Sequence, residues 1–363
     1  MLPREVISTG SLLLRPPADG DVQDIVRAFD DPETGRFLPL TPLPYRAEDA
    51  VEYLKAAQVK WEGGGAEFAI TEGGRYVGSI GVRAPDQWGV TEIGYLVAPW
   101  ARGRGVAATA TRALTDWLFD RGVRRVELQA EVENVASLRV AVKSGFREEG
   151  RRREVKLLRD GRYADLITFG RLAHDPGDAE EPYLPFFADG QLTDGVVRLT
   201  PMTVDDAVPF NAMMAEEAVA AYSVGPAGTL DDHVRRCRNT GYWWLSGQRI
   251  ELAIRDAATD AFAGHVQLMQ VAPVLGQAMI GYSLVSAYRG RGFMTRAVNL
   301  LVDWTFANTA LHRVVAGTDE SNTASHAVLE RAGFTRECRH RQLLPRPDGT
   351  RADDIEWLRL RPA

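Results

Sequence analysis

Cysteine is scarce in this chain, and long apolar runs are absent from it. Among its 363 residues, only Cys237 and Cys338 carry thiols, and neither lies at metal-ligand spacing from another cysteine. We therefore expect two reduced thiols in a reducing compartment. No apolar stretch approaches the ~20 residues of a membrane-spanning helix, and the first residues lack the apolar core of a signal peptide. The sequence predicts a cytoplasmic protein with no membrane partner.

Positive charge and clustered histidines are also lacking. The net charge of −6 argues against a general affinity for nucleic acid, so we expect no nucleic-acid partner. The histidines are dispersed without metal-ligand spacing, and we expect no bound metal. The apolar content of 45% and charged content of 25% are typical of a globular protein with real cores.

The chain does contain one stretch that occurs twice, at residues 93–107 and 280–294. Each copy begins Ile-Gly-Tyr and continues, after a few residues, into Arg-Gly-Arg-Gly. A short apolar strand, a Gly/Arg loop and the start of an amphipathic helix follow one another in both copies. The copies are a whole domain apart, which is too far for a solenoid unit.

The repeat predicts two domains of the same fold. We place them at residues 1–173 and 194–363, joined by a linker at 174–193 whose proline, glycine and acidic residues interrupt helix and strand periodicity. Each half reads as short strands, a hairpin and amphipathic helices without strict βαβ alternation. The predicted fold class is therefore α+β, with a mixed, mainly antiparallel sheet flanked by helices in each domain.

The two Gly/Arg loops are candidate phosphate-binding sites. Glycine lets backbone N–H groups approach an anion at a helix N-terminus, and arginine adds charge-assisted donors. The loop residues that would do this are Arg102, Gly103, Arg104, Gly105, Arg289, Gly290, Arg291 and Gly292. A solvated turn is the alternative for either loop alone, and a dinucleotide fingerprint is a second alternative for the first.

Two motifs in order resemble the GNAT superfamily of N-acyltransferases. The segment 102–107, Arg-Gly-Arg-Gly-Val-Ala, resembles the family's Q/R-x-x-G-x-G/A acyl-CoA loop. Asn134-Val-Ala-Ser137 followed by Gly145-Phe146 resembles the N-x-x-S…G-F segment of its Rim-type branch, which acetylates ribosomal-protein N-termini. Both motifs recur in the second half, where the loop ends in Met294 instead of glycine or alanine. The resemblance identifies a tandem GNAT protein whose two domains form a pseudo-dimer.

The resemblance implies which residues contact acetyl-CoA or another acyl-CoA. The pyrophosphate would bind the two loops and the helix starts Val106, Ala107, Phe293 and Met294. The strand before each loop would splay at a bulge, and its backbone would pair with the pantetheine arm at Leu96 and Val97, and at Leu284 and Val285. Further contacts with that arm are expected from Asn134, Ser137, Asn322 and Ser325, although asparagine followed by serine three residues later is also a helix-capping pattern.

The implied reaction is direct attack of a primary amine on the thioester, which requires a proton acceptor. The candidates are Glu92, on the strand before the first loop, and Glu154, on a later strand. Ser137 would protonate the leaving thiolate. The tyrosine acid of many family members is replaced by Ala141 and Leu329. An exposed ion pair with an arginine is the alternative for Glu92.

The first domain is predicted to be the catalytic one, because Met279 replaces Glu92 in the second. Two alternatives remain open: one or both domains hold CoA without chemistry, or the fold serves an aminoacyl-tRNA-dependent transfer. The acceptor is expected to be a small-molecule amine or a peptide or protein N-terminus. The assembly expected is a monomeric pseudo-dimer, with a higher oligomer as the alternative.

Overall fold

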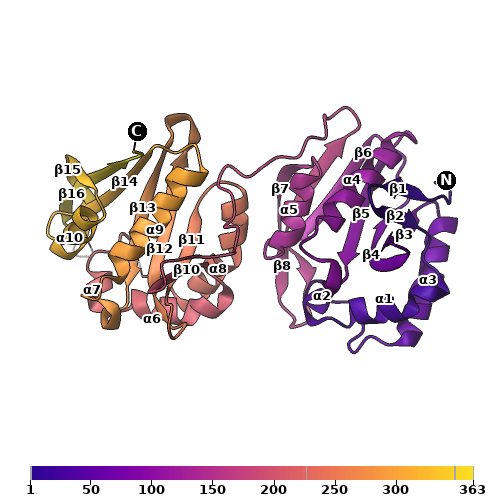
Figure 1. Ribbon diagram of the computed structural model, residues 1–363, viewed down its shortest axis with the longest axis horizontal. Coiled ribbons are helices and arrows are strands. Elements are labelled where there is room, and N and C mark those ends of the chain that lie inside the picture. Colours follow the sequence, from indigo (N-terminus) through magenta and orange to yellow (C-terminus); the bar gives the residue numbers. More distant parts are fainter. Residues whose placement is uncertain (1, 226, 347–348, 363) are drawn as a thin grey trace. The chain divides into compact units, whose positions relative to one another are not determined.

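The computed structural model describes residues 2–225, 227–346 and 349–362. The chain divides into two compact units, Met1–Glu181 and Pro182–Ala363, each with its own sheet and helices (Figure 1). The division falls inside the segment predicted as the linker. None of the helices formed by the described residues is both long enough and apolar enough to cross a membrane.

The first unit contains one mixed sheet in the strand order β1-β2-β3-β4-β5-β6-β8-β7. All neighbouring strands in it pair antiparallel except β5 and β6. In chain order its elements are β1 (Ile7–Thr9), β2 (Leu12–Arg15), α1 (Val22–Phe29), α2 (Pro32–Phe37), α3 (Ala47–Glu62), β3 (Ala66–Glu72), β4 (Arg75–Val82), β5 (Val90–Val97), α4 (Val106–Phe119), β6 (Arg125–Glu131), α5 (Val135–Lys143), β7 (Arg147–Leu157) and β8 (Tyr163–Leu172).

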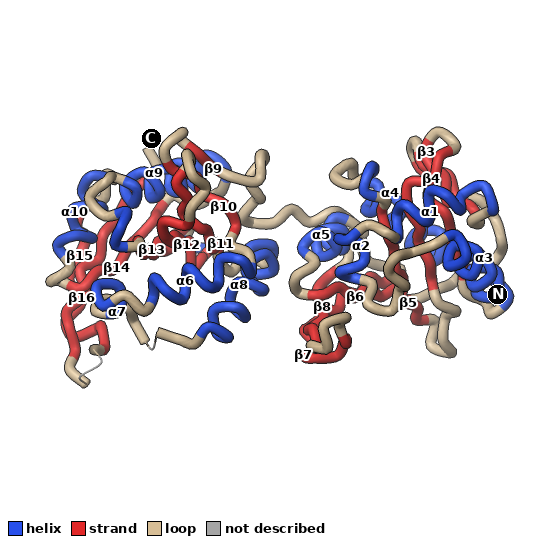
Figure 2. The backbone as a smooth tube through the Cα atoms, turned by 90° about the horizontal axis from the view of Figure 1, so that it is seen from below, coloured by secondary structure: helices blue, strands red, loops and turns tan. Residues whose placement is uncertain are grey.

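The second unit repeats this topology in the order β15-β16-β14-β13-β12-β11-β10-β9, with β13 and β14 as the parallel pair. Its elements are β9 (Leu192–Thr193), β10 (Val197–Pro201), α6 (Ala207–Met214), α7 (Glu217–Ala220), α8 (Leu230–Leu245), β11 (Ile250–Asp256), β12 (Phe262–Ala272), β13 (Gln277–Leu284), α9 (Phe293–Asn308), β14 (Arg313–Asp319), α10 (Thr323–Arg331), β15 (Thr335–Pro345) and β16 (Arg351–Leu360). In Figure 2 its strands lie between α9 and α10 on one side and α6 and α8 on the other. The predicted α+β class is confirmed in both units.

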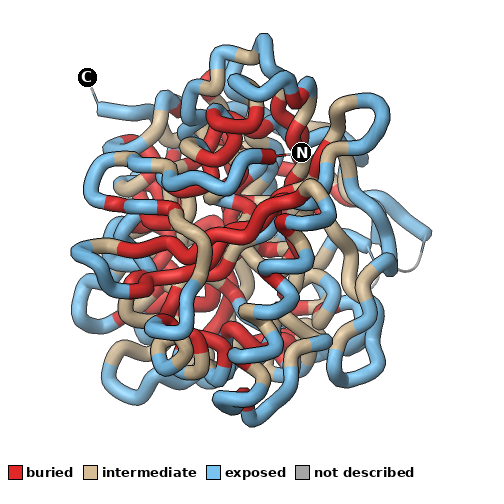
Figure 3. The backbone as a smooth tube through the Cα atoms, turned by 90° about the vertical axis from the view of Figure 1, so that its right-hand side faces the viewer, coloured by how far each residue is buried: buried red, intermediate tan, exposed pale blue. Residues whose placement is uncertain are grey.

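The apolar stripes predicted after the two loops face the cores. In α4 the stripe residues Val106, Ala110, Leu114 and Leu118 are all buried, and so are Met294, Val298, Leu301 and Thr305 in α9. The buried stretches run through the strands and the inner helix faces, whereas the connecting loops are exposed (Figure 3). This burial of one face fixes each helix against its sheet.

The later part of the predicted linker packs into the second unit. Leu184 and Phe187 are buried in its hydrophobic core. Trp244 donates from Nε1 to the Leu184 carbonyl at 3.1 Å, and Phe186 stacks on its ring at a centroid distance of 5.0 Å. These contacts make residues 184–187 part of the second unit.

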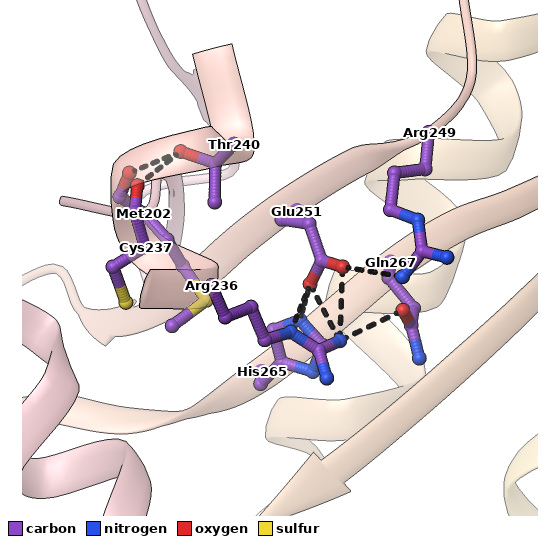
Figure 4. A network of polar contacts seen from close by, with 8 residues as sticks. All are labelled: Met202, Arg236, Cys237, Thr240, Arg249, Glu251, His265 and Gln267. Carbon is purple, nitrogen blue, oxygen red and sulfur yellow. Dashed lines mark hydrogen bonds and ion pairs between the residues drawn. The ribbon is translucent and has the colours of Figure 1, made fainter. Parts of the chain in front are cut away.

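A buried carboxylate ties the helical layer to the sheet in the second unit (Figure 4). Glu251 of β11 accepts from Arg236 of α8 at 2.8 Å and lies 2.6 Å from the His265 Nε2 of β12. Burial alone would raise the pKa of Glu251, but the hydrogen bond from His265 and the charge of Arg236 hold it at about 2. Burial lowers the pKa of His265, so at neutral pH a neutral imidazole donates to an ionised carboxylate.

The first unit has a carboxylate at the matching strand position. Glu67 of β3 accepts from the Tyr53 hydroxyl at 2.8 Å and from the Lys60 ammonium at 2.7 Å. Both partners lie on α3, so each unit fastens a helix to its sheet through one buried glutamate, with different donors.

Candidate active site

The parallel strands of each sheet separate toward the Gly/Arg loop. In the first unit β5 pairs with β6 at Val90–Glu92, whereas its pairing with β4 runs from Ile93 to Val97. In the second unit β13 pairs with β14 at Gln277–Met279, before the residues Ile280–Leu284 that lie beside β12. The second half of β5 therefore has one backbone edge that is not paired with β6, and the second half of β13 has one that is not paired with β14.

No bulge is needed to open this gap in the first unit. The pairing of β4 with β5 stays in step from Val82↔Ile93 to Gly78↔Val97, so the predicted bulge at Leu96 and Val97 is wrong. Beyond Glu92, β5 continues along β4 and β6 continues along β8, so the two parallel strands are no longer paired with each other. This exposes one backbone edge of β5 while the other edge remains in the sheet.

The predicted pair in the second strand is displaced by one residue. Gly78 faces Val97 and Gly264 faces Leu284 across the equivalent strands. The residues that match Leu96 and Val97 are therefore Ser283 and Leu284, and Val285 already caps the short turn that follows β13. The residues of β13 that correspond to the predicted pantetheine-pairing edge of β5 are thus Ser283 and Leu284, and Val285 lies outside it.

The two loops have the same backbone conformation. Gly103 and Gly105 have φ values of 74° and 78°, and Gly290 and Gly292 have values of 71° and 77°. This left-handed region strains residues that carry a Cβ. A Cβ at any of the four would meet nothing within 4 Å. Glycine is therefore required by the turn, and the space in front of each loop is open.

Each loop delivers an uncapped helix N-terminus. Gly105 is the N-cap of α4 and Gly292 that of α9, and neither helix start has a side-chain cap. First-turn N–H groups without an internal partner, together with the helix dipole, form an anion site. Met294 is buried in the core, so the departure from glycine or alanine at this position leaves the same helix start in place.

The loop follows β5, the fifth strand along the chain, and β5 with β6 is the one parallel pair in an otherwise antiparallel sheet. A dinucleotide fingerprint belongs in the first βα turn of a parallel sheet. The structure therefore excludes the dinucleotide alternative for residues 103–108.

The first arginine of each loop is paired with a carboxylate at the start of a short helix. Arg102 donates to Asp31 at 2.6 Å and to the Thr34 hydroxyl at 2.8 Å. Asp31 is the N-cap of α2. Arg289 lies 3.7 Å from Glu216, the N-cap of α7. The loops are thus connected to equivalent helices in both units.

The second arginine of each loop has a partner at the end of an inner strand. Arg104 pairs with Glu72 of β3, and Arg291 lies 3.8 Å from Asp256 of β11. All four loop arginines therefore have a carboxylate nearby, and an incoming phosphate competes with these partners for the guanidinium groups.

Asn134 and Asn322 both cap helices. The Asn134 Oδ1 accepts from the Ser137 backbone N–H at 3.0 Å at the start of α5, and Asn322 does the same for Ser325 at 3.1 Å in α10. In this structure both asparagine side chains therefore act as helix caps, as the alternative interpretation of the Asn-x-x-Ser pattern predicted. This capping fixes the first turn of each helix and so the position of the serine.

Each of these serines faces a partly buried tyrosine. The Tyr95 hydroxyl lies 2.7 Å from the Ser137 Oγ, and the Tyr282 hydroxyl lies 2.8 Å from the Ser325 Oγ. Burial raises the pKa of both phenols, to about 12 for Tyr282, so both stay protonated near neutral pH. The repeated Ile-Gly-Tyr marks this tyrosine in both copies, but nothing local in the sequence pairs it with a serine.

Glu92 lies at the point where β5 and β6 separate. Its carboxylate is 3.4 Å from the exposed Arg83 guanidinium. This contact is the ion pair with an arginine that was the alternative to a catalytic role for Glu92. Positions two apart share a strand face, and Leu96 packs with Ile25 and Ala50 of α1 and α3. Glu92 therefore lies on the α1/α3 face, and Met279 occupies the equivalent place in β13.

Glu154 lies in an irregular part of the edge strand β7. Its φ is 50°, and its backbone N–H donates to Asp165 at 2.8 Å. Gln342 repeats both features, with a φ of 51° and a bond of 2.7 Å to Asp353. The shared features belong to the backbone turn, and they do not depend on a carboxylate at this position.

Comparison with known proteins matches both halves of the chain to the same family. The model of the acetyltransferase (GNAT) domain matches residues 11–147 and 197–335. The probable N-acetyltransferase YjcK of Bacillus subtilis is 42% identical over 91 residues, which cover 25% of this chain and 50% of that protein. The putative ribosomal N-acetyltransferase YdaF of the same organism is 32% identical over 113 residues, covering 31% of this chain and 61% of that protein. The chain thus spans about half the length of the curated relatives it matches.

Among solved structures, ribosomal-protein-S5-alanine acetyltransferase from Vibrio fischeri superposes with a TM-score of 0.44 at 22% identity, over 47% of this chain and 96% of that one. RimJ from Mycobacterium smegmatis, in complex with CoA-disulfide, gives 0.43 at 24% identity, over 47% and 86%. The two stretches matched by the family model cover most of both units. The chain belongs to the GNAT acetyltransferase family and carries one such domain in each half.

Proposed function

We propose that the protein is an acyl-CoA-dependent N-acetyltransferase that acylates a primary amine by direct attack on the thioester. The observation that carries this proposal is the arrangement around Gly105, where a free backbone edge of β5 leads into an uncapped helix N-terminus. The helix start suits a pyrophosphate, and a strand edge suits an extended arm with amide groups.

The residues of the first unit fit an acyl-CoA. The first-turn N–H groups of α4, with Arg102 and Arg104, would hold the pyrophosphate, and the splayed edge at Leu96 and Val97 would pair with the pantetheine arm. When bound, acetyl-CoA supplies the activated acyl group. The corresponding residues of the second unit are Ser283 and Leu284, Arg289, Arg291 and the first turn of α9.

Proton transfer is assigned to side chains on the two faces of β5. Glu92 takes the proton of the attacking amine, directly or through water, because its carboxylate stands where β5 and β6 separate. Ser137 gives a proton to the leaving thiolate, and the partly buried Tyr95 hydroxyl lies beside it at 2.7 Å. Glu154 is the second candidate for the proton acceptor.

The first unit is proposed to catalyse, because it has Glu92 where the second has Met279. The second unit then binds CoA in a structural or regulatory role. The acceptor is proposed to be a peptide N-terminus or a small-molecule amine, and the name of the relative YdaF supports the first choice. The cytoplasmic location and the pseudo-dimer arrangement stay predictions.

The test combines binding and turnover. Calorimetric titration with acetyl-CoA counts the competent loops, and release of free thiol with a panel of peptide and small-molecule amines measures transfer. Glu92→Gln is expected to lower turnover strongly, whereas Met279→Leu serves as the matched control. Full activity in Glu92→Gln together with its loss in Ser325→Ala would reverse the assignment of the two units. Absence of any acetyl-CoA binding would favour the aminoacyl-tRNA-dependent alternative.

A further inference from the structure

Three side chains of different chemistry converge on the β15–β16 hairpin of the second unit. Cys338 and His340 lie two positions apart on β15, and Glu356 faces Cys338 across the strand pair. The Cys338 Sγ is 3.3 Å from the His340 Nε2, and this nitrogen is 3.2 Å from a Glu356 carboxylate oxygen. The three ligand atoms all lie within 4.8 Å of one another.

Hydrogen bonding alone does not satisfy this group. A ring nitrogen offers either one proton or one lone pair, so the His340 Nε2 makes one good hydrogen bond to either the sulfur or the carboxylate. A cation bound between the three atoms would satisfy all of them together.

Two of the three separations are close to those of a small tetrahedral site. Zinc bonds of about 2.3 Å to sulfur and about 2.0–2.2 Å to nitrogen and oxygen place neighbouring ligand atoms roughly 3.3–3.6 Å apart. The two distances observed here, 3.3 and 3.2 Å, differ from this range by a few tenths of an ångström at most. The Cys338 Sγ and the Glu356 carboxylate oxygen lie within 4.8 Å of each other, and rotation of these two side chains would bring both atoms to an ion beside the His340 Nε2.

The local charge favours a cation. The Glu356 carboxylate belongs to the cluster and lies 3.2 Å from the His340 Nε2. Asp354 faces His340 across the strand pair. It is 4% exposed, and its Oδ1 has no hydrogen-bond partner among the described residues. A divalent ion would offset this concentration of negative charge and stabilise the thiolate.

The fold itself does not require these side chains. In the first unit, the pairs Gly150↔Thr168 and Arg152↔Leu166 stand where the second has Cys338↔Glu356 and His340↔Asp354. The matching hairpin of the first unit is therefore built without a set of metal ligands. The cluster is a property of the second unit alone.

The cluster is open to solvent. Glu356 and its neighbour Trp357 point to opposite faces of β16, and Trp357 is buried against His326 of α10. Cys338 is exposed and the His340 side chain is 42% exposed. In Figure 1 the hairpin forms one edge of its sheet.

We propose that Cys338, His340 and Glu356 form a binding site for one divalent transition-metal ion of the zinc class, with its fourth position open to water. Three protein ligands and an exchangeable fourth are the arrangement of an accessible zinc site. The mixed sulfur, nitrogen and oxygen set favours zinc or cobalt over magnesium or calcium.

The site can be tested with Co²⁺ as a spectroscopic probe on the untagged, metal-stripped protein. One equivalent should give the visible bands of a tetrahedral ion and a sulfur-to-cobalt charge-transfer band, and one equivalent of Zn²⁺ should remove both. Cys338→Ser should abolish the sulfur band. His340→Gln should weaken Zn²⁺ binding by at least about 100-fold, the upper range already seen for outer-shell substitutions. His174→Gln, which alters an exposed histidine of the first unit, is the matched control and should bind as the parent does.

Thiol labelling gives an independent readout, because Cys237 is buried and Cys338 is exposed. Zn²⁺ should protect one thiol of the native protein from a disulfide reagent, and a chelator should restore its reactivity. Circular dichroism and thermal unfolding of the metal-free variants check that they fold. An unchanged Zn²⁺ affinity in Cys338→Ser, or a cobalt spectrum without the sulfur band, would overturn the proposal. Labelling of Cys338 at the same rate with and without stoichiometric Zn²⁺ would do so too.

Discussion

The Tyr95 hydroxyl lies 2.7 Å from the Ser137 Oγ across a chain separation of 42 residues, and Tyr282 repeats this relationship with Ser325 at 2.8 Å. The pair joins β5, the strand that leads to the loop, with the first turn of α5, which Asn134 caps. Its presence in both units makes each serine part of a partly buried two-hydroxyl contact, in which the tyrosine restricts the orientation of the serine hydroxyl.

Tyr95→Phe should lower kcat about ten-fold, because one hydrogen bond worth ~1.4 kcal/mol no longer orients Ser137. The KM for acetyl-CoA should change little, since the phenol lies away from the loop. Thiol-release kinetics measure both. Tyr282→Phe is the matched control and should leave turnover intact. An equal loss in both variants would show that both units contribute to turnover.

Gly105→Ala should raise the KM for acetyl-CoA roughly 3- to 30-fold, because the displaced helix start loses part of its anion binding. It should also destabilise the first unit by about 1–2 kcal/mol, the cost of a left-handed alanine. Gly122, just after α4, has a φ of 81° and equally open surroundings. Gly122→Ala should therefore cost similar stability in denaturant unfolding with no change in KM. Similar KM values in the two variants would contradict the role of the loop.

Asp31→Asn should tighten acetyl-CoA binding by up to about five-fold, since an exposed ion pair worth at most ~1 kcal/mol no longer competes for Arg102. Asparagine can still accept the Thr34 N–H bond that caps α2, so the helix should remain. Calorimetry at low and high salt measures the change, which should shrink as salt rises. Glu216→Gln tests the equivalent competition for Arg289. Weaker binding in Asp31→Asn would mean that Asp31 positions Arg102 for the ligand.

The second unit should lose stability as the pH falls below about 6.5. Folding lowers the pKa of His265 from its ordinary value of 6.5 and that of Glu251 from 4.5 to about 2. The unfolded chain therefore binds more protons than the folded one, first at His265 and then at Glu251, and the stability present above these pH values is lost in that order. Denaturant unfolding between pH 7 and pH 3 checks the trend.

Glu251→Gln should destabilise the second unit by about 3–5 kcal/mol even at neutral pH, because Arg236 lies partly buried beside it and would lose its counter-charge. The loss of stability between pH 4.5 and pH 3 should shrink in this variant. A variant as stable as the parent at pH 7 would contradict the role given to this carboxylate.

Much of the fold could be predicted from the sequence, because the repeated segments are short patterns whose local structure depends on neighbouring residues alone. The glycines at 103 and 105 mark a left-handed turn wherever they occur, and the stripes of α4 and α9 follow helical periodicity. The pairing of Leu284 and Val285 with Leu96 and Val97 was wrong because the two copies differ in length by one residue between the loop and the Asn motif. Aligning the two halves on Asn134 and Asn322 shifts the strand by one residue, whereas aligning them on Arg102 and Arg289 places it correctly.

The side-chain partners were out of reach of sequence patterns. Arg102 and Asp31 are 71 residues apart, and nothing local in either segment indicates the other. The same holds for Tyr95 and Ser137, where each residue also has an ordinary local role. Cys338 and Glu356 meet because a hairpin aligns them, and an irregular register within β15 hides that alignment from simple counting.

The packing of Leu184 and Phe187 against Trp244 also determines at which residue a stable fragment containing the second unit can begin. A fragment starting at residue 194 would leave a large indole without its covering residues and expose apolar surface that invites aggregation. A fragment that starts at Pro182 keeps this cover and the Trp244 hydrogen bond to the Leu184 carbonyl. The duplicated module of the second half therefore begins before its first strand, within the segment whose composition is that of a spacer.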